Sequence, residues 1–193
     1  YYGEDNNITG LYSHSFPEIP EGYDFDFINP DALLSEISVK GGKAVTGSGK
    51  EYKVICLDRN CTRMSLEVLK KIALLASRGV IICGQVPSVP AIMYDSRTEF
   101  EAIFKDIWFS GRENVFGGTW LDEVMLTSGI SPDLKVLRGR DIRSVHRTLQ
   151  EGEIYWVNSP VSESQSVEVS LRVCGLKPQK WDPMNGEVSD LSY

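Results

Sequence analysis

Tyr52-Lys-Val-Ile-Cys-Leu57 and Gly79-Val-Ile-Ile-Cys-Gly84 flank an amphipathic run that covers residues 65–78. The two outer runs are short, apolar and rich in β-branched residues, as in parallel strands that are covered on both faces. The run between them carries apolar side chains at helical spacing, namely Leu66, Leu69, Ile72, Ala73 and Ala76. This order predicts a strand, a crossover helix and a second, parallel strand. Neither strand end carries a phosphate loop, a nucleophile elbow or a metal cluster.

The residues before this unit predict smaller elements. Asn29 is suited to cap a helix that starts at Pro30, and the glycine pair at 41–42 predicts a β-hairpin over residues 37–45. Aromatic and acidic residues alternate over residues 23–27, which predicts a short strand with its rings packed inward. Gly47-Ser-Gly-Lys50 resembles a phosphate loop, but it precedes a strand instead of joining a strand to a helix, which favours a turn.

The residues after this unit predict two more helices and a set of strands. Ser96 begins a capping box, and large apolar side chains follow it at helical spacing up to Trp108. Residues 114–119 predict a third short strand, and Thr119 is suited to cap the next helix. No helix interrupts the extended segments that follow, which predicts antiparallel pairing. These segments are residues 140–149, 152–158 and 167–174, with a turn at 181–188.

The predicted elements define an α/β fold of two parts. A length of 193 residues is enough for one well-buried domain with a small appendage. We expect a three-layer α/β domain with a mostly parallel sheet over residues 1–139. An antiparallel β extension over residues 140–193 would pack on it or lead to a further β-domain.

Composition excludes several classes of partner. The formal net charge of −7 disfavours nucleic acid and anionic membrane surfaces, since both attract basic stripes. No apolar run approaches the roughly 20 residues that a membrane-spanning helix needs. The chain opens on Tyr1-Tyr2 without an initiator Met or a leader, so we expect a piece of a longer protein.

Six segments, in this order, resemble the region that follows the catalytic barrel in α-L-rhamnosidase-type glycoside hydrolases, and together they cover most of the chain. They are Tyr2-Gly-Glu-Asp5, Pro20-Glu-Gly-Tyr-Asp-Phe-Asp-Phe-Ile-Asn29, Met64-Ser-Leu-Glu-Val-Leu-Lys-Lys71, His146-Arg-Thr148, Glu153-Ile-Tyr-Trp-Val-Asn158 and Trp181-Asp-Pro-Met-Asn-Gly-Glu187. The resemblance implies a Rossmann-like or flavodoxin-like domain of the glutamine-amidotransferase type, packed beside the barrel and continuing into β-rich domains.

The same resemblance implies a non-catalytic accessory domain of a secreted or periplasmic enzyme of polysaccharide degradation. The acid and base carboxylates that cleave the glycosidic bond belong to the barrel in that family, so no catalytic residue is expected in this chain. No cofactor and no metal are expected. The implied partners are the barrel and β-domains of the parent chain, and an oligosaccharide.

Two groups of residues are candidates for contact with a sugar or with a neighbouring domain. Gly3, Glu4 and Asp5 would lie at the carboxyl end of a strand if Tyr1-Tyr2 is a strand tail, whereas a frayed terminus is the alternative. Three tryptophans offer rings that stack on sugars or fill an interdomain contact, although ordinary packing is the alternative for each. They are Trp120, Trp156 and Trp181.

An independent enzyme is the alternative function. Cys83 and His146 are the only candidate pair for a cysteine-dependent amidotransferase or hydrolase. Cys83 lacks a glycine-flanked elbow, and no carboxylate follows His146 at a spacing suited to orient it. The four cysteines show no metal-type spacing and are expected to be small core thiols. A nucleotide-binding module is disfavoured as well, because Gly117-Gly118 alone does not make a dinucleotide fingerprint.

Overall fold

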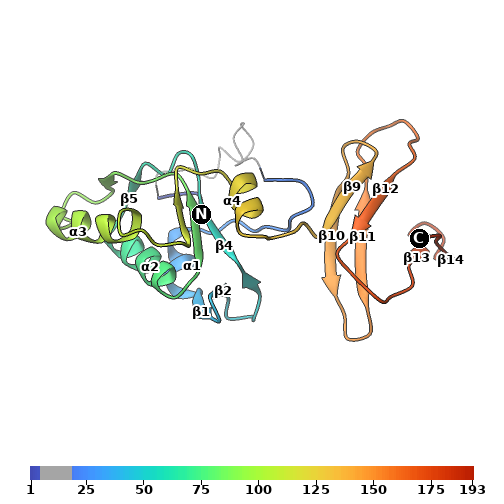
Figure 1. Ribbon diagram of the computed structural model, residues 1–193, viewed down its shortest axis with the longest axis horizontal. Coiled ribbons are helices and arrows are strands. Elements are labelled where there is room, and N and C mark those ends of the chain that lie inside the picture. The colour runs from blue at the N-terminus through green and yellow to red at the C-terminus, as the bar shows by residue number, and fades with distance from the viewer. Residues whose placement is uncertain (5–18) are drawn as a thin grey trace. The chain divides into compact units, whose positions relative to one another are not determined.

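Figure 1 shows the computed structural model of the chain, which describes residues 1–4 and 19–193. By their internal contacts these residues form two compact units. The first comprises Tyr1–Pro20 and Phe25–Ile130, and the second comprises Glu21–Asp24 and Ser131–Tyr193. The structural division after Ile130 differs from the one expected after residue 139, and the second unit also takes in a short segment from early in the chain.

The centre of the first unit is a parallel sheet with the strand order β4-β6-β8. Its strands are β4 (Val54–Leu57), β6 (Ile81–Gly84) and β8 (Val115–Gly117). Helix α2 (Leu66–Ser77) follows β4 and precedes β6, which confirms the predicted strand, crossover helix and parallel strand. The chain is therefore a mixed α/β protein with a parallel sheet and, as described below, antiparallel strands.

The Tyr1 backbone lies along the other edge of β4. Its amino group donates a hydrogen bond to the Cys56 carbonyl (2.8 Å), and its carbonyl accepts one from the Asp58 N–H (3.0 Å). Bonds to residues on either side of Leu57 are the pattern of a parallel neighbouring strand. Two backbone hydrogen bonds therefore hold Tyr1 to the edge of β4.

Helices α1 (Pro30–Ser35) and α3 (Arg97–Trp108) begin at side-chain caps. The Asn29 side chain accepts a hydrogen bond from the backbone N–H three residues on, at 2.8 Å. The Ser96 hydroxyl does the same at 3.3 Å. Both predicted caps are confirmed, and each satisfies an N–H that has no partner inside its helix.

Helix α4 (Leu121–Thr127) begins differently. Trp120 occupies its N-cap position, and no side chain caps the helix, so the predicted Thr119 cap is wrong. The Thr119 carbonyl accepts a hydrogen bond from the Gly84 N–H (3.1 Å), which holds this residue to the end of β6 instead.

Two small sheets complete the first unit. Strands β1 (Ser38–Lys40), β2 (Lys43–Val45) and β3 (Glu51–Tyr52) pair antiparallel in that order. They confirm the predicted hairpin and the turn after it. Strands β5 (Arg63–Met64) and β7 (Val89–Pro90) form a short parallel pair that the sequence did not predict.

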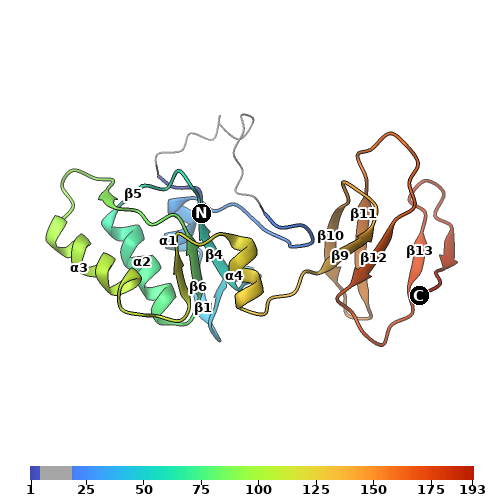
Figure 2. The ribbon, with the colours of Figure 1, turned by 45° about the horizontal axis from the view of Figure 1, so that its top comes forward.

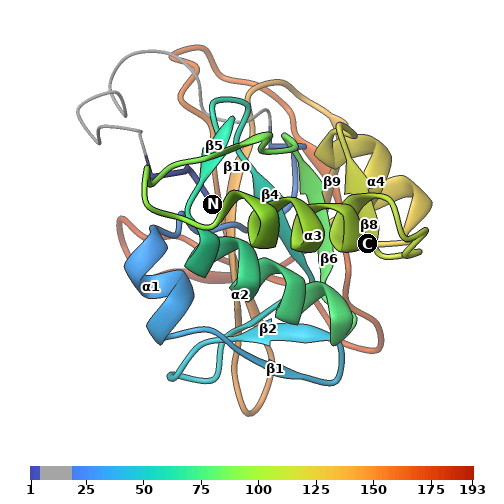
Figure 3. The ribbon, with the colours of Figure 1, turned by 90° about the vertical axis from the view of Figure 1, so that its left-hand side faces the viewer.

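The two faces of the parallel sheet bury different apolar clusters. Because side chains alternate along a strand, Ile55 and Leu57 of β4 lie in one cluster and Cys56 packs against the other. Helices α1, α2 and α3 contribute to the first cluster, and Figure 3 shows them side by side. Helix α4 contributes to the second cluster, on the other side of the sheet in Figure 2.

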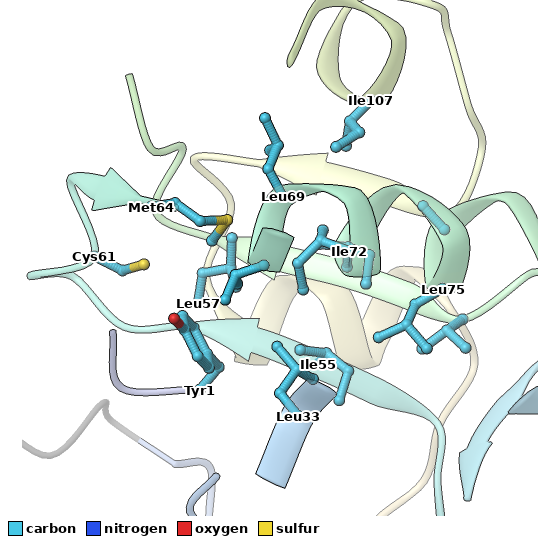
Figure 4. Close-up of a cluster of buried hydrophobic side chains, with 14 of the residues drawn as sticks. Tyr1, Leu33, Ile55, Leu57, Cys61, Met64, Leu69, Ile72, Leu75 and Ile107 are labelled. Carbon is cyan, nitrogen blue, oxygen red and sulfur yellow. The ribbon is translucent and has the colours of Figure 1, made fainter. Parts of the chain in front are cut away.

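Helix α2 supplies much of the first cluster, as its predicted apolar stripe requires. Leu69, Ile72 and Leu75 are fully buried, and Figure 4 shows Ile72 directed toward the sheet and Leu69 toward Ile107 of α3. Each such side chain contributes about 1.5–3 kcal/mol through burial before the entropy of ordering is subtracted. Leu33 of α1 is fully buried in the same cluster.

The second unit consists of antiparallel strand pairs, as predicted. The β10–β11 hairpin and the β13–β14 hairpin pair neighbours in sequence, whereas β9 pairs with the more distant β12. The sequence did not predict β9. The strands are β9 (Leu134–Arg138), β10 (Arg143–Thr148), β11 (Glu153–Asn158), β12 (Glu168–Leu171), β13 (Gln179–Trp181) and β14 (Val188–Asp190).

The predicted strand over residues 23–27 is wrong. This segment has no regular structure, and the Phe25 and Phe27 rings are 47% and 41% exposed. The two rings contact each other edge to face, with centroids 5.4 Å apart. Asp26 between them accepts hydrogen bonds from the Lys50 ammonium and the Tyr52 hydroxyl, both at 2.5 Å. Asp26 therefore attaches this segment to Lys50 and to Tyr52 of β3.

Candidate functional site

The carboxyl ends of β4, β6 and β8 form the edge at which open α/β sheets bind ligands. Gly84 at this edge has a φ of +92°, and a Cβ atom there would lie 2.2 Å from the Leu57 carbonyl oxygen. Asp58 follows β4 and is buried, and its side chain accepts hydrogen bonds from both nitrogens of Asn60 (2.9 and 3.0 Å). This carboxylate closes its own turn, which leaves it a structural role at the edge.

Trp120 follows β8 at the same edge, and 41% of it is exposed. The Arg59 guanidinium lies over its ring, 4.4 Å from the ring centroid, in a cation–π contact. Sequence reasoning identified Trp120 but missed Arg59, because the two meet only when β4 and β8 enter one sheet. One face of the Trp120 ring is thus already covered by a cation.

Two carboxylates bind the N-terminus of α2. Glu4 accepts a hydrogen bond from the Ser65 N–H (2.5 Å), and Asp95 accepts one from the Leu66 N–H (2.8 Å). Acidic groups are favoured here because the helix dipole is positive at this end. Of the predicted contact residues, Glu4 therefore binds the start of α2 and Gly3 directly precedes Glu4 in the chain, whereas Asp5 lies outside the residues that the structure describes.

The second unit contains a polar cluster around His146 of β10. Its Nε2 lies 2.8 Å from a Glu153 carboxylate oxygen, and its Nδ1 lies 3.4 Å from Asp133. Arg172 donates a hydrogen bond to the other oxygen of Asp133. The expectation that no carboxylate orients His146 is wrong, because the hairpin register sets Glu153 diagonally across from it.

Two members of this cluster, Glu153 and Tyr155, have shifted pKa values. The hydrogen bonds from His146 and Thr148 lower the pKa of the Glu153 carboxyl. Tyr155 stacks on the His146 ring, with centroids 4.2 Å apart. Burial, together with the carboxylates of Asp133 and Glu153, raises the pKa of Tyr155. Through Asp133 and Arg172, this cluster joins the β10–β11 hairpin to the neighbourhood of β9 and β12.

A metal does not account for the cluster. In residues 1–4 and 19–193, no group of three or more His, Cys, Asp or Glu side chains has an arrangement that could hold a metal ion. The cluster was only partly predictable from sequence. The hairpin pattern could have brought Glu153 to His146, whereas Asp133 and Arg172 are 39 residues apart and gave no signal.

The other two tryptophans lie on strands of the second unit. Trp156 of β11 is 55% exposed and pairs with Val145 of β10. Trp181 of β13 is 70% exposed and pairs with Val188 of β14. Neither is buried, so both rings are accessible within the chain. Trp120 belongs to the first unit, whereas Trp156 and Trp181 lie on two different hairpins of the second.

The geometry does not support an amidotransferase centred on Cys83 and His146. The Cys83 thiol is 1% exposed and packs against Leu121 and Val124 of α4, in a different unit from His146. Its hydrogen bond with Cys56 and its burial raise the pKa of the Cys83 thiol far above the ordinary range. A nucleophile needs the opposite, since the thiolate is the reactive form.

Comparison with known proteins assigns the chain. A profile of glycoside hydrolase family 106, alpha-L-rhamnosidase, matches residues 1–193. The chain belongs to this alpha-L-rhamnosidase family. A solved structure of a rhamnosidase from Novosphingobium sp. PP1Y is similar to all of this rhamnosidase-family chain, with a TM-score of 0.91 and 28% identity. This chain covers 20% of that protein.

A curated relative carries a different name. A protein of Formosa agariphila, named "Putative beta-glucuronidase", is 28% identical over 194 residues. The match covers 97% of this rhamnosidase-family chain and 16% of the relative. The chain therefore spans about a sixth to a fifth of the proteins it matches. Separately, every helix in the described part of the chain is too short or too polar to cross a membrane.

Proposed function

We propose that this chain is a non-catalytic accessory region of an α-L-rhamnosidase-type glycoside hydrolase that degrades polysaccharide. The observation that carries the proposal is the family match over residues 1–193, combined with the small share of each relative that the chain spans. The catalytic carboxylates would then lie in a barrel elsewhere in the parent protein. The parent would be secreted or periplasmic, where polysaccharides are found.

The state of the carboxylates supports a non-catalytic role. A glycosidase needs two carboxyl groups facing a sugar across an open cleft, one of them free to act as acid. Glu153 and Asp133 instead face His146, and Glu4 and Asp95 face the start of α2. Each of these groups already serves as a structural acceptor.

The architecture supports the accessory domain type that the family resemblance implies. Helices that contribute to both faces of the β4-β6-β8 sheet are consistent with a three-layer, Rossmann-like or flavodoxin-like domain of the glutamine-amidotransferase type. Its partners would be the barrel and β-domains of the parent chain. The exposed rings of Trp120, Trp156 and Trp181 would supply contacts with these domains or with an oligosaccharide.

Hydrolysis assays test this proposal. We expect the intact parent protein to release the aglycone from an aryl α-L-rhamnoside, and the isolated chain to release none. An aryl β-glucuronide serves as the second substrate, because the relatives carry both names. Turnover of either glycoside by the isolated chain would contradict the accessory role. If the parent protein hydrolyses only the glucuronide, the proposal that it acts on α-L-rhamnosides is wrong.

A substitution in the intact protein distinguishes a catalytic role of Glu153 from a structural one. Glu153→Gln keeps the shape of the side chain and can keep a hydrogen bond to His146. We expect kcat to fall by no more than about threefold, whereas loss of a catalytic carboxylate typically costs several orders of magnitude.

A further inference from the structure

One face of the β10–β11 hairpin differs in character from the rest of this acidic chain. Because side chains alternate along each strand, the face opposite His146 carries six side chains. These are Arg143, Val145, Arg147, Ile154, Trp156 and Asn158, called here the tryptophan face. Val145, Ile154 and Trp156 are 43%, 48% and 55% exposed. The face is therefore an aromatic and aliphatic surface open to solvent.

The charge of the tryptophan face is positive. It carries two arginines and no acidic side chain, although the chain as a whole has a net charge of −7. Arg147 is partly engaged, since it donates to the His146 carbonyl (2.7 Å) and lies 3.9 Å from Asp24. Arg143 makes no ion pair with any described residue. The Arg143 guanidinium is therefore able to donate hydrogen bonds to an anionic group of a ligand.

Trp156 lies between the two arginines. It pairs directly with Val145, so Arg143 and Arg147 occupy the diagonal positions across the strand, within reach of its ring. No cation lies over the Trp156 ring within the described part of the chain, in contrast to Trp120, whose ring Arg59 covers. An uncovered indole with cationic side chains at its edges can stack on a sugar ring and bind an acidic substituent at the same time.

We infer that the tryptophan face binds a carboxylated glycan, with one sugar ring stacked on Trp156 and its uronate carboxylate paired with Arg143. This inference rests on the proposed function, because it takes polysaccharide to be the material that the parent protein acts on. It adds the chemical class of the ligand, a uronic-acid oligosaccharide, and the face of the hairpin that recognises this ligand. Asn158 pairs with Arg143 across the strands and supplies an amide for sugar hydroxyls.

Calorimetry on the intact protein tests the inference. The probe is tetragalacturonate, and cellotetraose is the neutral probe of equal length. We expect tetragalacturonate to bind more tightly, and its advantage to shrink as salt rises from 50 to 500 mM, because exposed charges are screened.

Substitutions identify the groups that bind. Trp156→Ala should weaken tetragalacturonate binding about tenfold or more, and Trp156→Phe should recover most of it by restoring a ring. Arg143→Gln should remove about tenfold of the preference for the acidic probe, and Arg143→Lys should keep part of it. Tyr94→Ala and Lys180→Gln remove an exposed aromatic and an exposed cation from outside the tryptophan face, and both should leave affinity unchanged.

Three results would overturn the inference: equal affinity for the two probes, unchanged binding after Trp156→Ala, or no binding by the wild type at millimolar probe. If a neighbouring domain covers the face, the wild type will show no binding and Trp156 will resist quenching by acrylamide. Hydrolysis of an aryl α-L-rhamnoside by the same wild-type sample is measured in parallel. If the protein hydrolyses the rhamnoside but does not bind tetragalacturonate, the inference about the tryptophan face is wrong and the proposed function stands. If it binds tetragalacturonate but does not hydrolyse the rhamnoside, the proposed function is wrong and the binding inference stands.

Discussion

Replacing Gly84 with alanine should destabilise the first unit far more than a surface glycine change does. Gly84 pairs with Leu57 in the β4–β6 register, and an added Cβ would lie 2.2 Å from the Leu57 carbonyl oxygen. That oxygen also accepts a hydrogen bond from the Gln85 N–H (3.0 Å), so the clash displaces a bonded group.

The cost has three parts, and a second glycine isolates one of them. The positive φ of +92° costs about 1–2 kcal/mol with a side chain, the overpacking about 1–3 and the weakened hydrogen bond about 1, or about 3–6 in total. Gly118 has a φ of +76° and nothing within 4 Å of an added Cβ, so Gly118→Ala should cost only the first part.

Urea unfolding followed by circular dichroism measures both variants. We expect Gly84→Ala to lower the unfolding midpoint clearly more than Gly118→Ala, with the same dependence on urea. If the two variants lose stability equally within about 0.5 kcal/mol, the close approach of β4 and β6 at Gly84 is wrong.

Three further outcomes are expected. Ser65→Ala should cost about 1 kcal/mol in urea unfolding, because the buried hydroxyl caps α2; no loss would contradict the cap. The lowered pKa of Glu153 means that its contribution to stability is present above the ordinary carboxyl pKa and lost as pH falls through the lowered value. His146→Gln should therefore raise the pKa of Glu153 in a carbon NMR titration of its carboxyl, and an unchanged titration would refute the pairing. In the native protein iodoacetamide should label exposed Cys174 quickly and buried Cys83 only after unfolding, as read by mass spectrometry; rapid labelling of Cys83 would reopen the enzyme alternative.

Local signals explain which parts of the fold were predictable. Helix α2 has apolar residues at helical spacing and a capping residue, and the strands on either side of it are β-branched apolar runs, so all of these signals agree. Helix α3 has a capping box at Ser96. Strand β9 has no such signal, because it pairs with β12 about thirty residues away and is only five residues long. The aromatic alternation at residues 23–27 gave a wrong prediction for a related reason: among the described residues no strand pairs with this segment, and its rings stay partly exposed.

The candidate site depends on contacts between residues that are far apart in the sequence, and such contacts leave no local sequence signal. Trp120 and Trp156 were identifiable as single residues, but Arg59 reaches Trp120 only through the sheet order. Arg143 becomes informative only when the hairpin register assigns it to the same face as Trp156. The candidate residues were therefore predictable one by one, whereas the partners that determine what each can bind became known only from the three-dimensional structure.

The short segment Glu21–Asp24 belongs to the second unit although it precedes nearly all of the first. The Gly22 carbonyl accepts a hydrogen bond from the Asp133 N–H (2.8 Å). A Cβ atom added to Gly22 would clash with the Leu134 carbonyl oxygen, so the two backbones approach closely. During synthesis on the ribosome this segment therefore emerges more than a hundred residues before its partner. The second unit can mature only after the first has been translated, and no single proteolytic cut can release it whole.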